Sequence, residues 1–136
     1  MFSIFIFMGK LVYLDCMIYT GYYNRLKEYD AAGLKTVSVS KTMPKGLVVY
    51  GKIPELSPDD SILWRYKNKE IDEMEYTSRY LDQLDWIGIR NILLKIHHFG
   101  DDVVLLCWEA PDKFCHRHIL ADYINRKTKL EIKEYE

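Results

Sequence analysis

The residues best suited to chemistry in this 136-residue chain lie within one short window. Two cysteines, a glutamate, a histidine and an arginine occur there: Cys107, Glu109, Cys115, His116 and Arg117. A thiol can act as a nucleophile, a carboxylate can act as a general acid or base, and an arginine can hold an anion. The window therefore predicts a site for thiol or acid–base chemistry, a metal site or an anion pocket.

The elements expected around this window would bring its polar groups to one edge of a sheet. Residues 103–107, with the sequence VVLLC, form a continuous apolar run that is typical of a buried parallel strand, and residues 115–126 have a helical pattern. Residues 108–114 then form the loop at the carboxyl edge of the sheet, where open α/β sheets bind ligands. With Asp112 as the helix N-cap, Cys115 would lie in the first helical turn, where free amides and the helix dipole lower a thiol pKa.

Helical spacing also predicts which of these residues face the sheet. Apolar residues follow both Cys115 and His116 at intervals of four, so these two side chains should continue the buried face of the helix and point toward the sheet edge. His118 and Asp122 share a different face, where a surface contact is expected.

Each candidate residue also has a plain structural interpretation. Cys107 ends a buried strand and could simply fill the core, and packing competes with a chemical role for Cys115. A zinc site is a further alternative, built from Cys107, Cys115, His116 and one of His97 or His98. Structural zinc sites favour cysteine pairs with two to four residues between them, whereas seven residues separate these two. We therefore expect neither a metal nor a cofactor.

The first part of the chain predicts a βαβ unit of a parallel sheet. Residues 16–20 form an apolar run, residues 22–33 have helical spacing that ends in a glycine, and residues 34–40 have the alternation of a strand. Within that second strand the letters VSVS alternate apolar and polar residues, which predicts a polar edge.

The middle of the chain is expected to be partly irregular and partly helical. Prolines and glycines break up residues 41–70, and the stretch after Ser57 allows at most one helical turn. Between residues 70 and 99 the spacing predicts two consecutive helices, or one helix bent near Gly88, and residues 129–136 predict a last strand. The fold class is therefore α/β: a single Rossmann-like domain with a mainly parallel sheet flanked by helices.

Composition limits the partners that we expect. An apolar content of 49% suits one globular domain, and 19 basic against 20 acidic residues give a net charge of −1. This charge provides no field for a polyanion, so contact with nucleic acid would need a local patch. Three cysteines without a secretory signal argue against a disulfide framework, and the expected location is the cytoplasm.

The N-terminal stretch MFSIFIFM looks like the start of a signal peptide or a membrane span. It lacks a basic n-region and its apolar run stops at Gly9, so it is too short to cross a bilayer, and no membrane contact is expected. Residues 1–16 are either a dispensable extension, with Met8 and Met17 as alternative starts, or an added edge strand, since their β propensity is strong. The main domain is expected over residues 17–136.

The segments LLCWE and FCHRHILADYI resemble the C-terminal signature of domain-of-unknown-function family 488, in which a strand ends in Cys-x-Glu and a Cys-His-Arg triplet opens the next helix. Upstream, MIYTGYYNRLKEY resembles the opening strand of the family, VSVS with Pro44 its second strand and loop, and EYTSRYLDQLD its central Tyr-x-x-x-Tyr helix. The resemblance covers roughly residues 17–136, and the compact form is one associated with bacterial and phage genomes. Family members open at the position of Met17, which supports the extension.

This resemblance implies an α/β fold with the polar residues gathered at one site, but it implies no reaction, because none is assigned to the family. Longer members carry an Asp-x-Arg motif after the second strand, where this chain has SVSKTMPKG, so Lys41 or Lys45 is the nearest candidate for that arginine. Catalytic roles are expected for Cys115, Glu109 and His116. From their positions we expect further ligand-binding side chains at the same edge: Arg117, Cys107, Thr20, Tyr22, Ser38, Ser40, Tyr76 and Tyr80. For the two last tyrosines core packing is an equal alternative.

Two function classes fit these residues. The first is an enzyme that acts on a nucleotide, a nucleoside or a nucleic-acid base, with aromatic rings to stack, Arg117 to hold an anion, and Cys115 or Glu109 as nucleophile or acid–base group. The second is a binding module that sequesters or senses a nucleotide-like ligand without turnover. A small zinc-binding protein or a protein-interaction partner is the remaining alternative.

Overall fold

A five-stranded sheet lies at the centre of the computed structural model, which describes residues 4–7, 10–13 and 17–136, with side chains from residue 17 onward. The strand order is β5-β4-β6-β3-β7, and every pairing in this sheet is parallel. The strands are β3 (Ile18–Tyr22), β4 (Lys35–Ser38), β5 (Gly51–Lys52), β6 (Val103–Cys107) and β7 (Lys133–Glu134). The chain is thus one α/β domain with a Rossmann-like parallel sheet, as the sequence predicted.

Strand β6 is the central strand, and all five of its residues are buried. Val103 and Leu105 pack into the core shared with α3, α4 and α5, whereas Val104 and Leu106 pack on the opposite face against α1. A strand covered on both faces has to be apolar at every position, because its side chains alternate between the two faces. The prediction of a buried parallel strand at 103–107 is confirmed.

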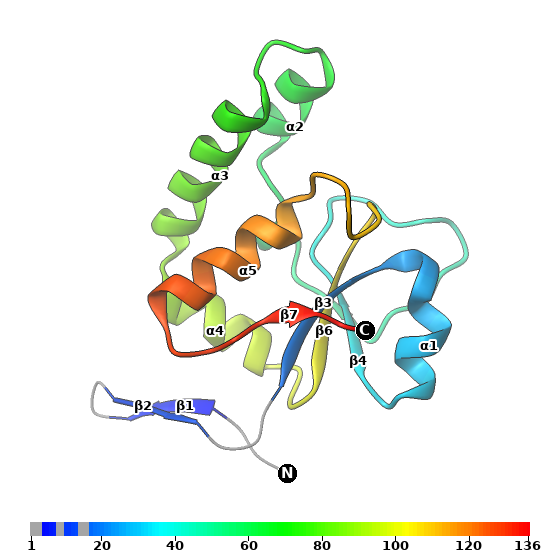
Figure 1. The fold of residues 1–136 in the computed structure, drawn as a ribbon, viewed down its shortest axis with the longest axis vertical. Helices are drawn as coiled ribbons and strands as arrows, with labels where there is room; N and C mark the ends of the chain where they lie inside the picture. Colours follow the sequence, from blue (N-terminus) through cyan, green and yellow to red (C-terminus); the bar gives the residue numbers. More distant parts are fainter. Residues whose placement is uncertain (1–3, 8–9, 14–16) are drawn as a thin grey trace.

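Helices cover both faces of the sheet (Figure 1). The helical segments are η1 (Tyr23–Arg25), α1 (Leu26–Ala31), η2 (Pro54–Leu56), α2 (Asp60–Lys67), α3 (Glu73–Ile87), α4 (Ile89–His97) and α5 (His116–Lys127). Gly88 separates α3 from α4 with a φ of 89°, a conformation that glycine adopts without a steric cost. The two consecutive helices expected between residues 70 and 99 are therefore confirmed, as is the helix after residue 115.

The structure corrects three details of the sequence-based prediction. Residues 60–67 form an eight-residue helix rather than one turn, because Ile62 is buried and the ring of Tyr66 packs on Tyr76 with centroids 5.1 Å apart. Strand β4 has no polar edge, since Ser38 is 1% exposed and its hydroxyl is paired with that of Tyr23. The last strand comprises two residues only.

The first 16 residues contribute a separate pair of strands. Strand β1 (Ile4–Phe7) pairs antiparallel with β2 (Lys10–Tyr13), and the five-stranded sheet includes neither of them. Met8 and Cys16 lie outside the described residues. Across the part of the chain that the structure describes, no helix combines the length and apolar character needed to cross a membrane.

Candidate functional site

The site forms where β6 ends and α5 begins. Strand β6 ends at Cys107, and the chain returns through a short loop to Cys115, which is the N-cap residue of α5 with extended backbone angles of −155° and 142°. The predicted capping role of Asp112 is wrong, because Cys115 itself precedes the helix and no side chain caps it. The site therefore lies at the N-terminal end of α5, where the helix dipole favours negative charge.

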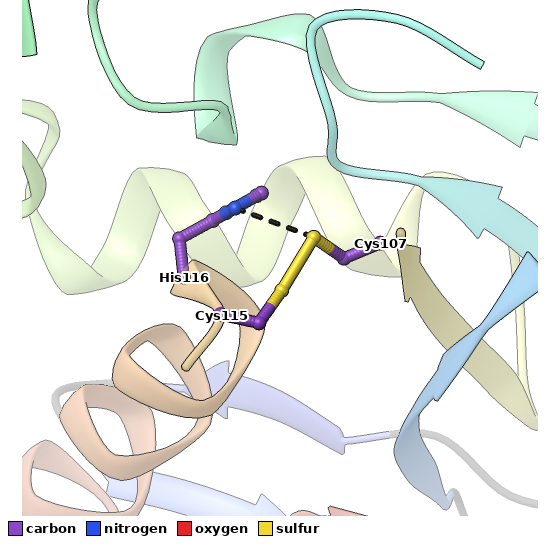
Figure 2. A group of neighbouring side chains, drawn as sticks. All are labelled: Cys107, Cys115 and His116. Carbon is purple, nitrogen blue, oxygen red and sulfur yellow. Dashed lines mark hydrogen bonds between the residues drawn. A yellow bond between two sulfur atoms is a disulfide. The ribbon is translucent and has the colours of Figure 1, made fainter. Parts of the chain in front are cut away.

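The two cysteines of the window are bonded to each other (Figure 2). Cys107 and Cys115 form a disulfide across eight residues, with their Cα atoms 7.3 Å apart, and both side chains are buried. The odd cysteine count argued against a disulfide framework, and this expectation is corrected for the Cys107–Cys115 pair. An odd number of cysteines does not prevent a disulfide, because two of the three can pair and the third, Cys16, is then not part of that bond.

His116 lies against this pair with a defined tautomer. Its Nε2 is 2.7 Å from the carbonyl oxygen of Val39, which can only accept a hydrogen bond, so Nε2 carries the proton. Its Nδ1 is therefore unprotonated, and it lies 3.5 Å from Sγ of Cys107 (Figure 2). Burial lowers the pKa of His116 to about 4, since desolvation outweighs the hydrogen bond to Val39. The imidazole is neutral at neutral pH.

Glu109 completes the group from the exposed side. Its Oε1 lies 3.9 Å from Sγ of Cys107, and its side chain is exposed to solvent. The structure thus brings together Cys107, Cys115, His116 and Glu109, as the sequence predicted for the edge of the sheet. However, it is Cys107 whose sulfur lies near both the imidazole of His116 and the carboxylate of Glu109. The sequence had predicted Cys115 as the catalytic thiol.

A cavity of about 530 Å³ opens over these residues. Its walls include three rings in mutual contact, with centroids of Tyr76 and Phe114 4.9 Å apart and those of Tyr66 and Phe114 5.6 Å apart. Trp108 and Lys41 also line it. Tyr66, Trp108 and Phe114 were not among the residues predicted from the sequence. For Trp108 and Phe114 a usable signal was their place in the loop that follows the end of β6.

Three of the predicted ligand-binding residues line this cavity: Cys107, Ser40 and Tyr76. Burial raises the pKa of Tyr76, and the negative charge of Glu109 raises it further. The phenol therefore stays protonated at neutral pH and can donate a hydrogen bond to a ligand.

The structure places the other predicted ligand-binding residues away from the cavity. Tyr80 is fully buried and its hydroxyl donates to the carbonyl of Leu56, while Ser38 is buried against Tyr23. The remaining three residues, Thr20, Tyr22 and Arg117, belong to a partly buried network beside β7.

Arg117 is the centre of that network and is 0% exposed. It donates two hydrogen bonds to the carboxylate of Glu134, at 3.1 and 2.9 Å, and a third to the carbonyl of Glu109 at 2.7 Å. Burial by itself raises the pKa of Glu134, but the hydrogen bonds from Arg117 and Thr20 outweigh this effect and hold the pKa below its usual value. Arg117 therefore holds the loop after β6 through the carbonyl of Glu109, and the carboxylate of Glu134 balances its charge.

Three of the site residues could also hold a metal ion. The ligand atoms of Cys107, Cys115 and His116 all lie within 4.8 Å of one another. Within residues 17–136, neither His97 nor His98 joins this group. Of the zinc ligands considered from the sequence, Cys107, Cys115 and His116 lie close together, whereas the fourth, His97 or His98, does not join them.

Comparison with known proteins gives one match. The model of a protein family with the description "DUF488-N3a: Active DUF488-N3 subclade" matches residues 20–128, which include every residue of the group around Cys107. No curated protein and no solved structure matches the chain.

Proposed function

This chain belongs to the DUF488 family, and on that premise we propose that it is an enzyme that acts on a nucleotide, a nucleoside or a nucleic-acid base. The observation that carries the proposal is the convergence of Cys107, Cys115 and Glu109 on a cavity with aromatic walls. The description of the matching model as an active subclade supports catalysis over passive binding. Family membership assigns no substrate, so the ligand class is argued from the cavity.

The walls of the cavity favour a flat, aromatic ligand. Tyr76 and Phe114 both line the cavity, and stacking of a base on an aromatic side chain contributes about 1–3 kcal/mol. A volume of about 530 Å³ lies in the range of small-molecule sites. Lys41 at the same cavity is a cation that can contact a phosphate, although it is paired with Asp60 at 3.2 Å. The net charge of −1 favours a single nucleotide or base over a long polyanion.

The reduced form of the protein is the one able to do thiol chemistry. In that form the thiol of Cys107 can donate a hydrogen bond to Nδ1 of His116 or to the carboxylate of Glu109. Burial lowers the pKa of His116 and keeps its imidazole neutral, so the ring accepts a hydrogen bond from the thiol. His116 therefore orients Cys107 and does not store its proton, which leaves Glu109 as the acid–base group at the solvent side.

A second function remains supported by one observation. In the disulfide form neither sulfur atom is a free nucleophile, so a protein that works in this form would bind a ligand in the cavity without turnover. The two functions share the aromatic cavity and differ in whether Cys107 reacts.

Substitution of the two reacting groups separates the functions. Reduced wild type, Cys107→Ser and Glu109→Gln are incubated with a panel of nucleotides, nucleosides and bases, and products are sought by mass spectrometry. The enzyme proposal predicts a product from the wild type, loss of that product in both variants, and ligand affinity within a few-fold of wild type by calorimetry. Cys16→Ser, which changes the remaining cysteine of the chain, is the control and should retain turnover. A ligand that binds the wild type and gives no product would favour the binding module instead.

A further inference from the structure

We propose that Cys107, Cys115 and His116 bind one divalent transition-metal ion of the zinc type when the disulfide is reduced. This site goes beyond the proposed function, because it does not depend on a nucleotide ligand. The sulfur atoms of Cys107 and Cys115 would then form either a disulfide or a metal–thiolate site, but not both at once.

The orientation of His116 is the first argument. Its Nε2–H group is held by the carbonyl oxygen of Val39, so the lone pair of Nδ1 points toward the sulfur of Cys107. Histidines that bind metals almost always donate their other ring N–H to a carbonyl, a carboxylate or a water, which fixes the tautomer for coordination. In this protein the backbone supplies that outer partner.

The distances also fit a tetrahedral ion. With metal–sulfur and metal–nitrogen bonds of about 2.3 and 2.05 Å, two ligand atoms on one tetrahedral ion lie about 3.6 Å apart. Sγ of Cys107 and Nδ1 of His116 are 3.5 Å apart, and Oε1 of Glu109 is 3.9 Å from the same sulfur. Glu109 is not among the residues whose ligand atoms all lie within 4.8 Å of one another, so a water molecule is then the fourth ligand.

The separation of the two cysteine backbones leaves room for an ion between the two sulfur atoms. Their Cα atoms are 7.3 Å apart, which is wide for a disulfide, whose Cα atoms are usually about 4.4–6.8 Å apart. Once the bond is reduced, side-chain rotation can move the sulfur atoms to the about 3.8 Å that two thiolates on one ion require.

Charge and ligand type select the ion. Cys107, Cys115 and His116 are buried, and two thiolates neutralise the charge of a divalent ion, so the metal and its protein ligands would carry no net charge. Sulfur and imidazole ligands favour zinc and similar ions over magnesium or calcium, which prefer oxygen. The cavity beside the three residues gives the ion a path from solvent.

The exchange between the two states balances in two steps. A dithiol reductant transfers two electrons and two protons to the Cys107–Cys115 bond, which gives two thiols and the disulfide of the reductant. The metal ion then displaces one proton from each thiol, so two protons are released for each ion bound.

Cobalt titration of the 136-residue chain tests this proposal. Reduced wild type, freed of reductant under anaerobic conditions, should bind one Co²⁺ per chain with a sulfur-to-cobalt charge-transfer band, and Zn²⁺ should bleach that band. The same protein in its disulfide form should show no band. This comparison needs no substitution, so it holds even where a variant fails to fold. A reduced wild type without the band would overturn the proposal.

Variants then assign the ligands. Cys107→Ser, Cys115→Ser and His116→Gln should each weaken Co²⁺ binding by more than the about 10- to 100-fold that loss of an outer-shell partner costs. Cys16→Ser is the control and should keep the affinity of the wild type, with folding of all variants checked by circular dichroism. Loss of the band in Cys16→Ser together with its retention in Cys107→Ser would contradict the assigned site. Because no nucleotide is present, failure of the proposed function would not affect either result.

Discussion

The Nε2–H group of His116 donates a hydrogen bond to the carbonyl oxygen of Val39 at 2.7 Å. This one contact joins the first turn of α5 to the chain just after β4. It also fixes which ring nitrogen faces Cys107, because a carbonyl accepts and never donates. The position and the chemistry of the site therefore depend on a bond to the backbone, whose acceptor is present whatever the side chain at residue 39.

Replacement of His116 should reduce stability as well as change the site. In His116→Ala the carbonyl of Val39 loses its buried partner, and we expect the free energy of unfolding to fall by about 1–3 kcal/mol. Urea unfolding of the disulfide form measures this difference. His98→Ala is the control, since His98 is exposed to solvent, and its loss should be smaller. Equal losses in the two variants would contradict the role given to this bond.

The buried ion pair between Arg117 and Glu134 should be far more sensitive than surface pairs. Arg117 is fully buried and the side chain of Glu134 is 19% exposed, so Glu134→Gln leaves a buried guanidinium without its counter-charge. We expect a loss of about 3–5 kcal/mol in unfolding free energy. Glu70→Gln removes the exposed pair with Arg65 and should cost less than about 1 kcal/mol. A loss in Glu134→Gln no larger than in Glu70→Gln would show that Arg117 is stabilised by other contacts.

The same pair predicts a dependence of stability on pH. The pKa of Glu134 is lower in the folded protein than its unfolded value of about 4.5, so its ionised form stabilises the fold above that pH. This contribution is lost as the pH falls through the folded pKa, because the carboxyl is then protonated in both states. The difference in unfolding free energy between wild type and Glu134→Gln should therefore be largest near pH 7 and shrink below about pH 4.5. A difference that stays constant from pH 7 to pH 3 would contradict the lowered pKa.

Sequence patterns predicted the elements that build the site because their signals are local. The run VVLLC must be buried on both faces, and the spacing after residue 115 is helical, so both elements were placed correctly. Their order along the chain was enough to bring Cys107, Glu109, Cys115 and His116 to one edge of a parallel sheet. Family resemblance rests on the same residues.

Contacts between distant segments were not predictable from these patterns. Arg117 follows His116 directly, but one step along a helix rotates the side chain by about 100°, which turns Arg117 away from the cavity and toward Glu134. Its partner lies 17 residues further along the chain, in a strand of two residues. The length of α2 was missed for the same reason, since its stability depends on the contact between Tyr66 and Tyr76 rather than on its own spacing.

Thiol counting tests the pairing of the two cysteines. Air-oxidised protein, unfolded in denaturant without reductant, should react with iodoacetamide at one cysteine only, Cys16, because Cys107 and Cys115 are bonded to each other. After reduction all three cysteines of the chain should be alkylated. Peptide mapping by mass spectrometry identifies the sites. Labelling of Cys107 without reduction would show that the pair is open under these conditions.

Binding of a nucleotide-like ligand in the aromatic cavity is the central claim, and a thermal-unfolding screen tests it most directly. Reduced protein is heated with each member of a panel of nucleotides, nucleosides and bases, beside Phe114→Ala in the cavity wall and the exposed control Trp86→Ala. A ligand at 100 times its Kd stabilises by about 2.7 kcal/mol, which corresponds to a rise in melting temperature of about 8 °C for a domain of this size. We predict such a rise for at least one compound with the wild type and Trp86→Ala, and a much smaller one with Phe114→Ala. No shift with any compound, or an equal shift in Phe114→Ala, would contradict the claim.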